Sequence, residues 1–599
     1  LRGNVNVAGT VQLQTTNGTP IQQQDAYVYV GDGTQASSLQ IGGTPAVSVT
    51  GNGDKRIFPD RDNSSVVYYG ANQTVWPVAY HDLGLAGSGV KTMTNVDSIY
   101  GNFFVAMTAI ANTAKGLVVK GDLGVNTGSV LNLGSYVHKV SGQIWQNSGT
   151  INAGTSKVIF DGPDTQIIFG DSLTEFYRLQ VDNDSGLVLL RDACAQDSLI
   201  MVNGLIYAFD TLCVHAGGII EGAGPDRFIA GFLKRGVPTG AQTLRYDIGG
   251  FVFMSLDNTV YAPMEVDFSG VSTGGWLTGS TYNTNHPNIG TSIINPLKTI
   301  KRYWSLFNEG VVFNTAGNDA DVTFNWDLAD VTAGLDTTLL LAGKYDTATW
   351  SYPGFSGLTD LSIVVPGLTG FSDFQFGECT LPTVYNMTGG GAYCAGGSGV
   401  AIGLDDSDTL ISYQLYRNDS IAVGSPVLGT SGGAISFGFQ TDSGFYSVVA
   451  THTQSFCTSI MNDTLEVIIN ENPSASVLSG DTCICLGGTA NLVVTITGGL
   501  SPYTVLIDTG TGDTTVNNYA SGSDIAVQPL VSTTYGLTSV TDANGCLSAA
   551  LSGNPVVTVD IASPDITCPS TATILCNETA DTSLTGGPVV VDNCTGLLT

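Results

Sequence analysis

Between residues 63 and 233 the sequence is a succession of short apolar segments separated by turn residues, and one such segment occurs twice. Residues 64–75 (SSVVYYGANQTV) return 92 positions later as residues 156–167 (SKVIFDGPDTQI). Each copy opens with a short apolar strand and turns at a glycine, Gly70 or Gly162. Short strand units of this kind bury a core by stacking on one another. The segment therefore predicts a β-helix-like or strand-repeat region over residues 63–233.

The composition extends this prediction to the whole chain. Of the 599 residues 42% are hydrophobic and 12% are charged, against about 25% charged in an average globular protein. Val, Ile, Tyr and Phe are too frequent for a disordered chain, and long helical patterns are missing. We expect an all-β protein in which the strand-repeat region is followed by β-sandwich and Ig-like sandwich modules.

The charge is strongly negative and unevenly distributed. The net charge is −31, and after Lys344 the 22 acidic residues face a single basic one, Arg417. Such a surface repels phosphate backbones and anionic lipids, so we expect no nucleic-acid partner. No run of about 18 apolar residues occurs, which argues against membrane insertion. Residues 1–4 do not resemble a signal peptide, and we expect the chain to be part of a longer or processed polypeptide.

Cysteine usage indicates export to an oxidising compartment. The eleven cysteines are widely spaced in an acidic, β-rich chain, a pattern typical of disulfides. None forms a Cys-x-x-Cys pair and the five histidines do not cluster with them, so we do not expect a zinc site or another cofactor. Spacing alone leaves the connectivity open. Cys194 and Cys213, 19 residues apart in the repeat region, are candidates for a clip between two neighbouring rungs.

Several motifs resemble a known family. Residues 158–162 (VIFDG), 176–181 (FYRLQV) and 227–235 (RFIAGFLKR) are similar to repeats in very large, adhesin-like surface proteins of Bacteroidota that are exported by type IX secretion. Residues 261–266 (YAPMEV) and 367–378 (GLTGFSDFQFGE) look like the β-domain that follows such repeats. Residues 389–404 and 485–492 resemble the openings of two Ig-like modules, and residues 565–594 resemble the opening of a HYR-type repeat.

These patterns together divide the chain into six parts. They are an N-terminal β segment or cap (1–62), the duplicated strand-repeat region (63–233), a β-sandwich domain (234–380), two Ig-like modules (388–471 and 475–560) and a partial HYR-like module (564–599). Several short alternating strands with turns between them are what each sandwich requires.

The resemblance to Ig-like and HYR-type modules also implies particular disulfides. The pairs within the two Ig-like modules are Cys394 with Cys457 and Cys485 with Cys546. The HYR-like pattern implies Cys576 with Cys594, which leaves Cys568 to a partner beyond Thr599. Cys379 and Cys483 remain, and we predict a bond between them across a domain junction.

Two sequence patterns that occur in enzymes offer an alternative to a purely structural role. Residues 170–174 (GDSLT) match the opening block of GDSL esterases, with Ser172 as nucleophile, but no aspartate lies three residues before any histidine to complete a triad. A β-helix can also be a polysaccharide lyase with an arginine base, such as Arg178 or Arg191, yet the sequence places no acidic cluster beside them. We therefore expect no catalytic residues and no enzyme.

Carboxylates and aromatic residues provide the remaining candidate sites. Asp405, Asp406 and Asp408 form a short acidic run, and Asp560 and Asp565 flank a module boundary, so structural calcium is a weak candidate at both places. Tryptophan side chains can stack on sugars, although most belong to the core. The candidates are Trp76, Trp145, Trp276, Trp304, Trp326 and Trp350.

From these observations we expect an extracellular, cell-surface protein that acts structurally and adhesively, as part of a stalk, filament or appendage for attachment, gliding or prey capture. Exposed strand edges predict self-association into a homo-oligomer or fibre, and cell-surface glycans or proteins are further expected partners. The alternatives are a glycan-binding, lectin-like region of a secreted protein, or a non-catalytic region of a secreted hydrolase.

Overall fold

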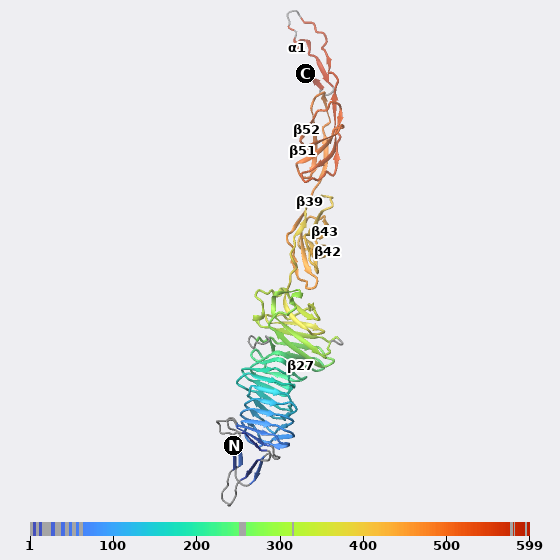
Figure 1. The fold of residues 1–599 in the computed structure, drawn as a ribbon. Coiled ribbons are helices and arrows are strands. Elements are labelled where there is room, and N and C mark those ends of the chain that lie inside the picture. The colour runs from blue at the N-terminus through green and yellow to red at the C-terminus, as the bar shows by residue number, and fades with distance from the viewer. Residues whose placement is uncertain are drawn as a thin grey trace. The chain divides into compact units, whose positions relative to one another are not determined.

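The computed structural model describes residues 64–250, 259–313, 317–574, 579, 581–592 and 596–598, together with six short strands before residue 64. The fold is all-β, as predicted. Its described helical elements are the four-residue helix α1 (Thr582–Thr585) and three short 3-10 helices, η1 (Ile289–Thr291), η2 (Leu328–Asp330) and η3 (Thr337–Leu339). The strands form two compact units, residues 1–380 and 381–599 (Figure 1). No helix of the described residues has the length and apolarity to span a bilayer.

The first unit is built on a β-solenoid, and its strands stack in parallel on three faces. The strands of the first face are β7 (Ser64–Tyr68), β9 (Asp82–Leu85), β12 (Phe103–Val105), β15 (Leu123–Val125), β18 (Ile144–Asn147), β21 (Gln166–Phe169), β23 (Leu187–Leu189), β25 (Ile206–Val214), β27 (Ile229–Val237) and β29 (Ile248–Gly249). The second face is a sheet of β8 (Gln73–Thr74), β10 (Val90–Met93), β13 (Ile110–Thr113), β16 (Val130–Asn132) and β19 (Thr150–Asn152). The third face comprises β11 (Ser98–Ile99), β14 (Val118–Val119), β17 (Val137–Val140), β20 (Lys157–Phe160), β22 (Thr174–Asp182), β24 (Ala193–Asn203) and β26 (Ile219–Glu221).

Six strands precede residue 64, and two of them, β1 and β4, belong to the same parallel sheet as β7. The six are β1 (Asn4–Val7), β2 (Val11–Gln14), β3 (Ala26–Tyr29), β4 (Ser37–Ile41), β5 (Val47–Thr50) and β6 (Lys55–Phe58). β1 pairs with β4, and β4 pairs with β7, in each case in parallel. Backbone pairing therefore extends the solenoid sheet through β4 to β1, whereas β2 pairs with β5 and β3 with β6 in two further parallel pairs.

The structural repeat of the solenoid is one turn of about 20 residues, because Phe103 pairs with Leu123 of the next turn. Leu83, Phe103 and Leu123 are in register and buried in one core, in which apolar side chains of successive turns lie over each other. The predicted 92-residue duplication is not a structural unit. Its first copy begins in β7 on the first face, whereas its second copy begins at β20 on the third face.

The parallel stack continues without a break into an antiparallel β-sandwich. One sheet extends from β27 through β31 (Gly275–Tyr282), β32 (Ile294–Glu309), β37 (Asp373–Cys379), β34 (Leu340–Asp346) and β35 (Thr349–Ser351). The other consists of β28 (Gln242–Tyr246), β30 (Met264–Phe268), β33 (Ala320–Asn325) and β36 (Ser362–Leu368). The predicted boundary between residues 233 and 234 lies inside β27, which pairs in parallel with β25 and antiparallel with β31. The two predicted domains are therefore one body.

A buried ion pair stabilises this sandwich. Arg302 is fully buried in β32, and its Nε and Nη2 donate to the Asp330 carboxylate at 2.9 and 3.1 Å. Arg302 Nη1 also donates to Thr281 Oγ1 at 3.2 Å. Two charges withdrawn from water in this way are tolerated only while both are present and hydrogen-bonded.

The second unit contains two sandwiches, which correspond in sequence to the two predicted Ig-like modules. The first comprises β38 (Met387–Gly389), β39 (Gly391–Cys394), β40 (Val400–Leu404), β41 (Ile411–Arg417), β42 (Ile421–Leu428), β43 (Ile435–Gln440), β44 (Gly444–His452), β45 (Thr458–Ile460) and β46 (Leu465–Asn470). The second comprises β47 (Pro473–Ser479), β48 (Thr482–Cys485), β49 (Ala490–Gly498), β50 (Tyr503–Asp508), β51 (Asp513–Tyr519), β52 (Asp524–Val527), β53 (Thr533–Thr534), β54 (Gly536–Thr541), β55 (Leu551–Ser552) and β56 (Val556–Asp560). A three-stranded sheet of β57 (Asp565–Thr567), β58 (Val589–Asp592) and β59 (Gly596–Leu598) follows. Each sandwich has its own hydrophobic core.

The disulfides differ from the predicted pattern in the second unit. Cys194 is bonded to Cys213, as predicted. Cys394, however, is bonded to Cys546 of the other sandwich, so the predicted pairs Cys394–Cys457 and Cys485–Cys546 are wrong.

Strand direction explains this result. Cys394 pairs in register with Asn470, beside the passage to the second sandwich, whereas Cys457 follows β44 at the opposite end of the first sandwich.

The remaining disulfide predictions concern Cys379 with Cys483, Cys568, and Cys576 with Cys594. Cys379, Cys457 and Cys483 are each disulfide-bonded, and Cys568 is exposed and unbonded. The predicted pair Cys576–Cys594 lies outside the described residues.

We expect Asp330→Ala to lower the free energy of unfolding of the first unit by about 3–5 kcal/mol, because it leaves the Arg302 charge buried and unpaired. Urea unfolding followed by tryptophan fluorescence measures this, since all six tryptophans precede residue 351. The matched control is Asp97→Ala, which removes an exposed pair with Lys115 and should cost at most about 1 kcal/mol. Equal losses in the two variants would contradict the assignment.

Protonation of His138 should destabilise the solenoid. Its Nδ1 accepts from the Leu117 N–H and its Nε2 lies 2.9 Å from Leu133 O, and burial lowers the pKa of this histidine below the ordinary 6.5. The unfolded chain therefore takes up a proton before the folded one, so stability present above pH 6.5 is lost as the pH falls below it. In urea unfolding by tryptophan fluorescence, His138→Gln should reduce this pH dependence. An unchanged slope would show that His138 does not contribute.

Candidate functional site

The candidate functional surface of the first unit lies where the parallel strands of the solenoid meet the antiparallel sheet. Strand pairing places six residues in one row across β22, β24, β25, β27, β31 and β32. In order, they are Glu175, Cys194, Cys213, Lys234, Thr278 and Phe307. Because side chains alternate along a strand, all six point to the same side of the sheet.

This side of the sheet faces away from the core. The residues that flank the two cysteines, Ala193, Ala195, Leu212 and Val214, belong to the buried core, so the cysteines point outward. Cys194 and Cys213 are nevertheless only about 5% exposed, because neighbouring side chains cover them. Phe307 at the other end of the row is 64% exposed.

Two depressions, of about 230 and 300 Å³, lie along this row. Both are lined by Thr211 and Lys234, so they form one surface groove, which we call the solenoid groove. Its first part contains the two cysteines, and its second part contains Phe307. A concave surface that combines aromatic rings with a few polar groups is typical of a binding site.

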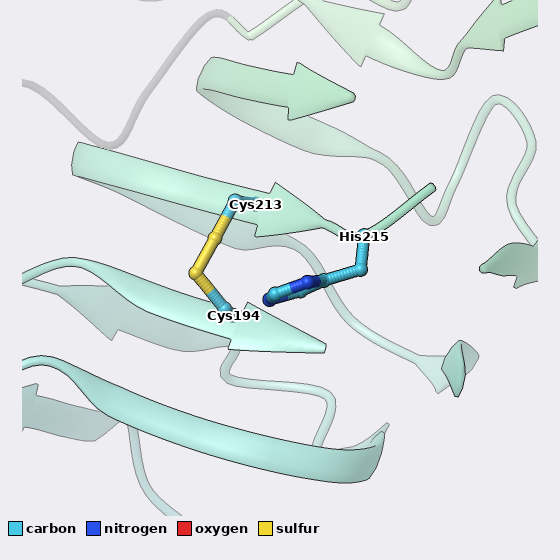
Figure 2. A group of neighbouring side chains, drawn as sticks. All are labelled: Cys194, Cys213 and His215. Carbon is cyan, nitrogen blue, oxygen red and sulfur yellow. A yellow bond between two sulfur atoms is a disulfide. The ribbon is translucent and has the colours of Figure 1, made fainter. Parts of the chain in front are cut away.

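A disulfide and a histidine form the floor of the first part (Figure 2). The Cys194 and Cys213 Cα atoms are 4.4 Å apart on neighbouring parallel strands. Figure 2 shows the His215 ring pointing toward Cys194, on the same side of the strands as the disulfide. His215 Nε2 is shielded from solvent and lies 3.2 Å from Glu175 Oε2, but it has no aligned hydrogen-bond partner.

A tryptophan and an ion pair close the groove on one side. Trp276 packs its ring against His215 at a centroid distance of 5.2 Å. Lys234 Nζ lies 5.4 Å from the centre of the Trp276 ring and 2.6 Å from Glu309 Oε2. The lysine charge is therefore balanced locally by a carboxylate and by the ring face.

Two carboxyl groups lie at the edge of the groove. The Thr211 N–H donates to Asp192 Oδ1 and to Asp210 Oδ1, each at 3.0 Å. A hydrogen bond with Asp192 and, secondarily, burial raise the pKa of Asp210 above its ordinary value. Two neighbouring carboxyl groups disfavour a negative charge on each other, which agrees with the direction of this shift. Asp192 follows Arg191 directly in the chain, and the fold brings Asp210 beside it, although the sequence indicated no acidic cluster near Arg191.

Ser172 and Arg178, the residues weighed for esterase and lyase chemistry, each have structural contacts. Ser172 lies in the turn between β21 and β22, and its N–H donates to Asn147 O at 3.0 Å. Arg178 is bound to Asp197, with Nε 2.8 Å from Oδ2. The role of Ser172 as a turn residue agrees with its position in the repeat.

The calcium candidates already accept hydrogen bonds from the protein. Asp405 accepts from the backbone and side chain of Asn386, and Asp408 accepts from the Tyr385 hydroxyl at 2.8 Å. Asp406 accepts from the N–H of Ser407. Asp560 Oδ1 accepts from the Ala562 N–H, and Asp565 is exposed in β57. Calcium at either place stays a prediction.

The burial of each tryptophan side chain determines whether it can contact a ligand. Trp145 and Trp304 are fully buried and Trp326 is nearly so, whereas Trp276 is half-buried and lines the solenoid groove. His215 was missed as a site residue because the histidines are distant from most cysteines in sequence. The spacing of Cys213 and His215, two residues apart in a strand, places both on one face and was the available signal.

No protein-family model and no curated protein matches the sequence. Among solved structures, the FN1–FN3 domains of chicken CNTN1 are 12% identical with a TM-score of 0.18, over 40% of this chain and 95% of that chain. The ectodomain (Ig1–Ig3) of mouse nectin-like molecule 4 is 13% identical with a TM-score of 0.17, over 38% and 93%. The BSP domain of a biofilm associated protein is 10% identical with a TM-score of 0.15, over 55% and 67%. Scores this low carry no argument about function, which therefore rests on the residues of this chain.

Proposed function

We propose that the protein is an extracellular structural and adhesive chain, a load-bearing part of a cell-surface stalk, filament or appendage. The observation that carries this proposal is the disulfide between Cys394 and Cys546, which joins two sandwiches across 152 residues of chain. Disulfides persist in oxidising, extracellular compartments. A solenoid and strung sandwiches provide reach and shape, which is what such a role requires.

The surroundings of this bond hold both cysteines in place. Asp542 Oδ1 accepts from the N–H groups of Asn544 and Cys546 at 2.9 and 2.8 Å, which fixes the loop that carries Cys546. On the other side, Asn472 Nδ2 donates to Ala395 O at 3.0 Å, next to Cys394. The covalent bond is thus set in a hydrogen-bonded joint between the two sandwiches.

The bond changes the path of a pulling force. Tension applied to the two ends of the chain passes from Cys394 directly to Cys546 through the sulfurs. The residues between them, which include most of both sandwiches, are then outside the loaded path even if they unfold. A chain without lysine after Lys344 has no amine-based cross-link available in this part, so disulfides and packing carry the load.

Self-association belongs to the same proposal. β42 is an edge strand of its sheet, and it carries the exposed side chains Ile421 and Leu428. An edge strand with exposed apolar residues pairs readily with another chain. This supports assembly into a homo-oligomer or fibre through the second unit.

We also propose that Ser172 and Arg178 are not catalytic. Ser172 lies in a turn, and Arg178 forms an ion pair with Asp197. If the chain belongs to a secreted hydrolase, the active domain lies outside it.

The load path can be tested by pulling single molecules from both ends. We expect a reductant to lengthen the fully unfolded chain by at least about 500 Å, because the 152-residue segment enters the path at roughly 3.3 Å per residue. The double variant Cys394→Ser with Cys546→Ser should show part of this gain without reductant. The control, Cys194→Ser with Cys213→Ser, frees 19 residues and about 60 Å. Equal lengths with and without reductant would refute the proposed role of the bond.

A second candidate function, glycan binding, is favoured by the solenoid groove. Trp276 and Phe307 provide ring faces, and Thr211, Ser280 and Ser305 add hydroxyl groups along the same surface. Aromatic rings with nearby hydroxyl partners are suited to the apolar faces and hydroxyl groups of sugars.

For glycan binding we expect Trp276→Ala and Phe307→Ala each to weaken capture on a glycan array by about tenfold, a loss of about 1.4 kcal/mol. Phe456→Ala is the matched control, because Phe456 is 76% exposed in the second unit and distant in sequence from the groove. Trp304 is unsuitable for this test since it is fully buried. Binding that survives both groove variants would exclude the groove as the glycan site.

A further inference from the structure

The floor of the solenoid groove gathers more metal-ligand chemistry than a structural disulfide requires. The ligand atoms of Cys194, Cys213 and His215 all lie within 4.8 Å of one another. They come from two neighbouring turns, because Cys194 and Cys213 are in register and His215 follows two residues later on the same face. Figure 2 shows the imidazole of His215 directed toward Cys194.

The state of His215 is an independent indication. Its Nε2 is shielded from solvent and makes no hydrogen bond, although it lies 3.2 Å from Glu175 Oε2. The carboxylate therefore pairs with Nε2 without a well-aligned hydrogen bond, and the nitrogen lone pair can be offered to a cation. The Glu175 charge beside Nε2 favours a cation at this place.

We propose that Cys194, Cys213 and His215 form a redox-gated site for a thiophilic dication such as Zn²⁺, with the two sulfurs and His215 Nε2 as the protein ligands. In the disulfide form the sulfurs are bonded to each other and the site is closed. When a thiol or phosphine reductant supplies two electrons, the S–S bond breaks and two protons give two thiols. The metal ion then displaces both thiol protons and forms two metal–sulfur bonds and one bond to Nε2.

The geometry of the strands fits such a centre. Tetrahedral Zn²⁺ with Zn–S bonds of about 2.3 Å places the two sulfurs about 3.8 Å apart. Side chains on Cα atoms 4.4 Å apart reach this separation by rotating about their own bonds, without movement of the strands. A Cys₂His set with one open position is a donor set that zinc accepts.

The charges around the site also suit a cation. Glu175 and Asp192 line the same part of the groove. The ammonium group of Lys234, which lines the same part of the groove, is held by Glu309 at 2.6 Å. The thiol groups are reached from the groove, since both cysteines line it.

Cobalt(II) is a suitable probe, because tetrahedral thiolate coordination gives it intense visible bands and a sulfur-to-metal charge-transfer band. The full-length chain, reduced anaerobically with a phosphine, should bind one Co²⁺ with this spectrum, and Zn²⁺ should displace it. The oxidised chain should give no such spectrum. His215→Ala should weaken binding by at least about tenfold and alter the visible bands.

Two double variants separate this site from the other thiols. Cys194→Ser with Cys213→Ser should abolish the signal, whereas Cys394→Ser with Cys546→Ser should keep it. Circular dichroism and tryptophan fluorescence verify that each variant is folded. The proposal is overturned if the reduced wild-type chain shows no tetrahedral cobalt, or if the signal persists without Cys194 and Cys213. It is also overturned if alkylation and mass spectrometry show that this disulfide stays closed in the folded, reductant-treated chain.

Discussion

The first unit depends on the register in which one turn of the solenoid hydrogen-bonds to the next. Parallel pairing at a spacing of about 20 residues places inward side chains over inward side chains, so that Leu83, Phe103 and Leu123 form one column. The same register creates the outward row from Glu175 to Phe307, because alternation leaves every second residue on the solvent side. Core and candidate site are thus two sides of one pairing pattern.

Sequence patterns predicted the strands, the all-β class and the two sandwiches, because alternation of apolar residues and turn glycines are local signals. The 20-residue period was missed for a physical reason. A core column requires an apolar side chain but not a particular one, so Leu123, Trp145 and Ile168 occupy equivalent positions without resembling each other. Residues 64–75 and 156–167 are more similar in sequence than successive turns are, yet they lie on different faces of the solenoid.

The disulfides show a similar limit. The bond between Cys194 and Cys213 could be predicted, since it joins adjacent turns and depends on local spacing. The partner of Cys394 depends on which end of its sandwich faces the next one, which local patterns do not encode. His215 lies between these cases, since its spacing from Cys213 was visible but its proximity to Cys194 required the register of the turns.

A stack of near-equivalent turns has a consequence for how such a chain changes over time. Each turn contacts only the turns beside it, so gain or loss of one 20-residue segment within the solenoid leaves the sandwich junction at β27 intact. Each added turn would lengthen the stack by about 4.8 Å, the spacing between paired strands. The height of this part of the molecule can therefore be adjusted in small, nearly independent steps by duplication or deletion of coding sequence, while the groove at its end keeps its geometry.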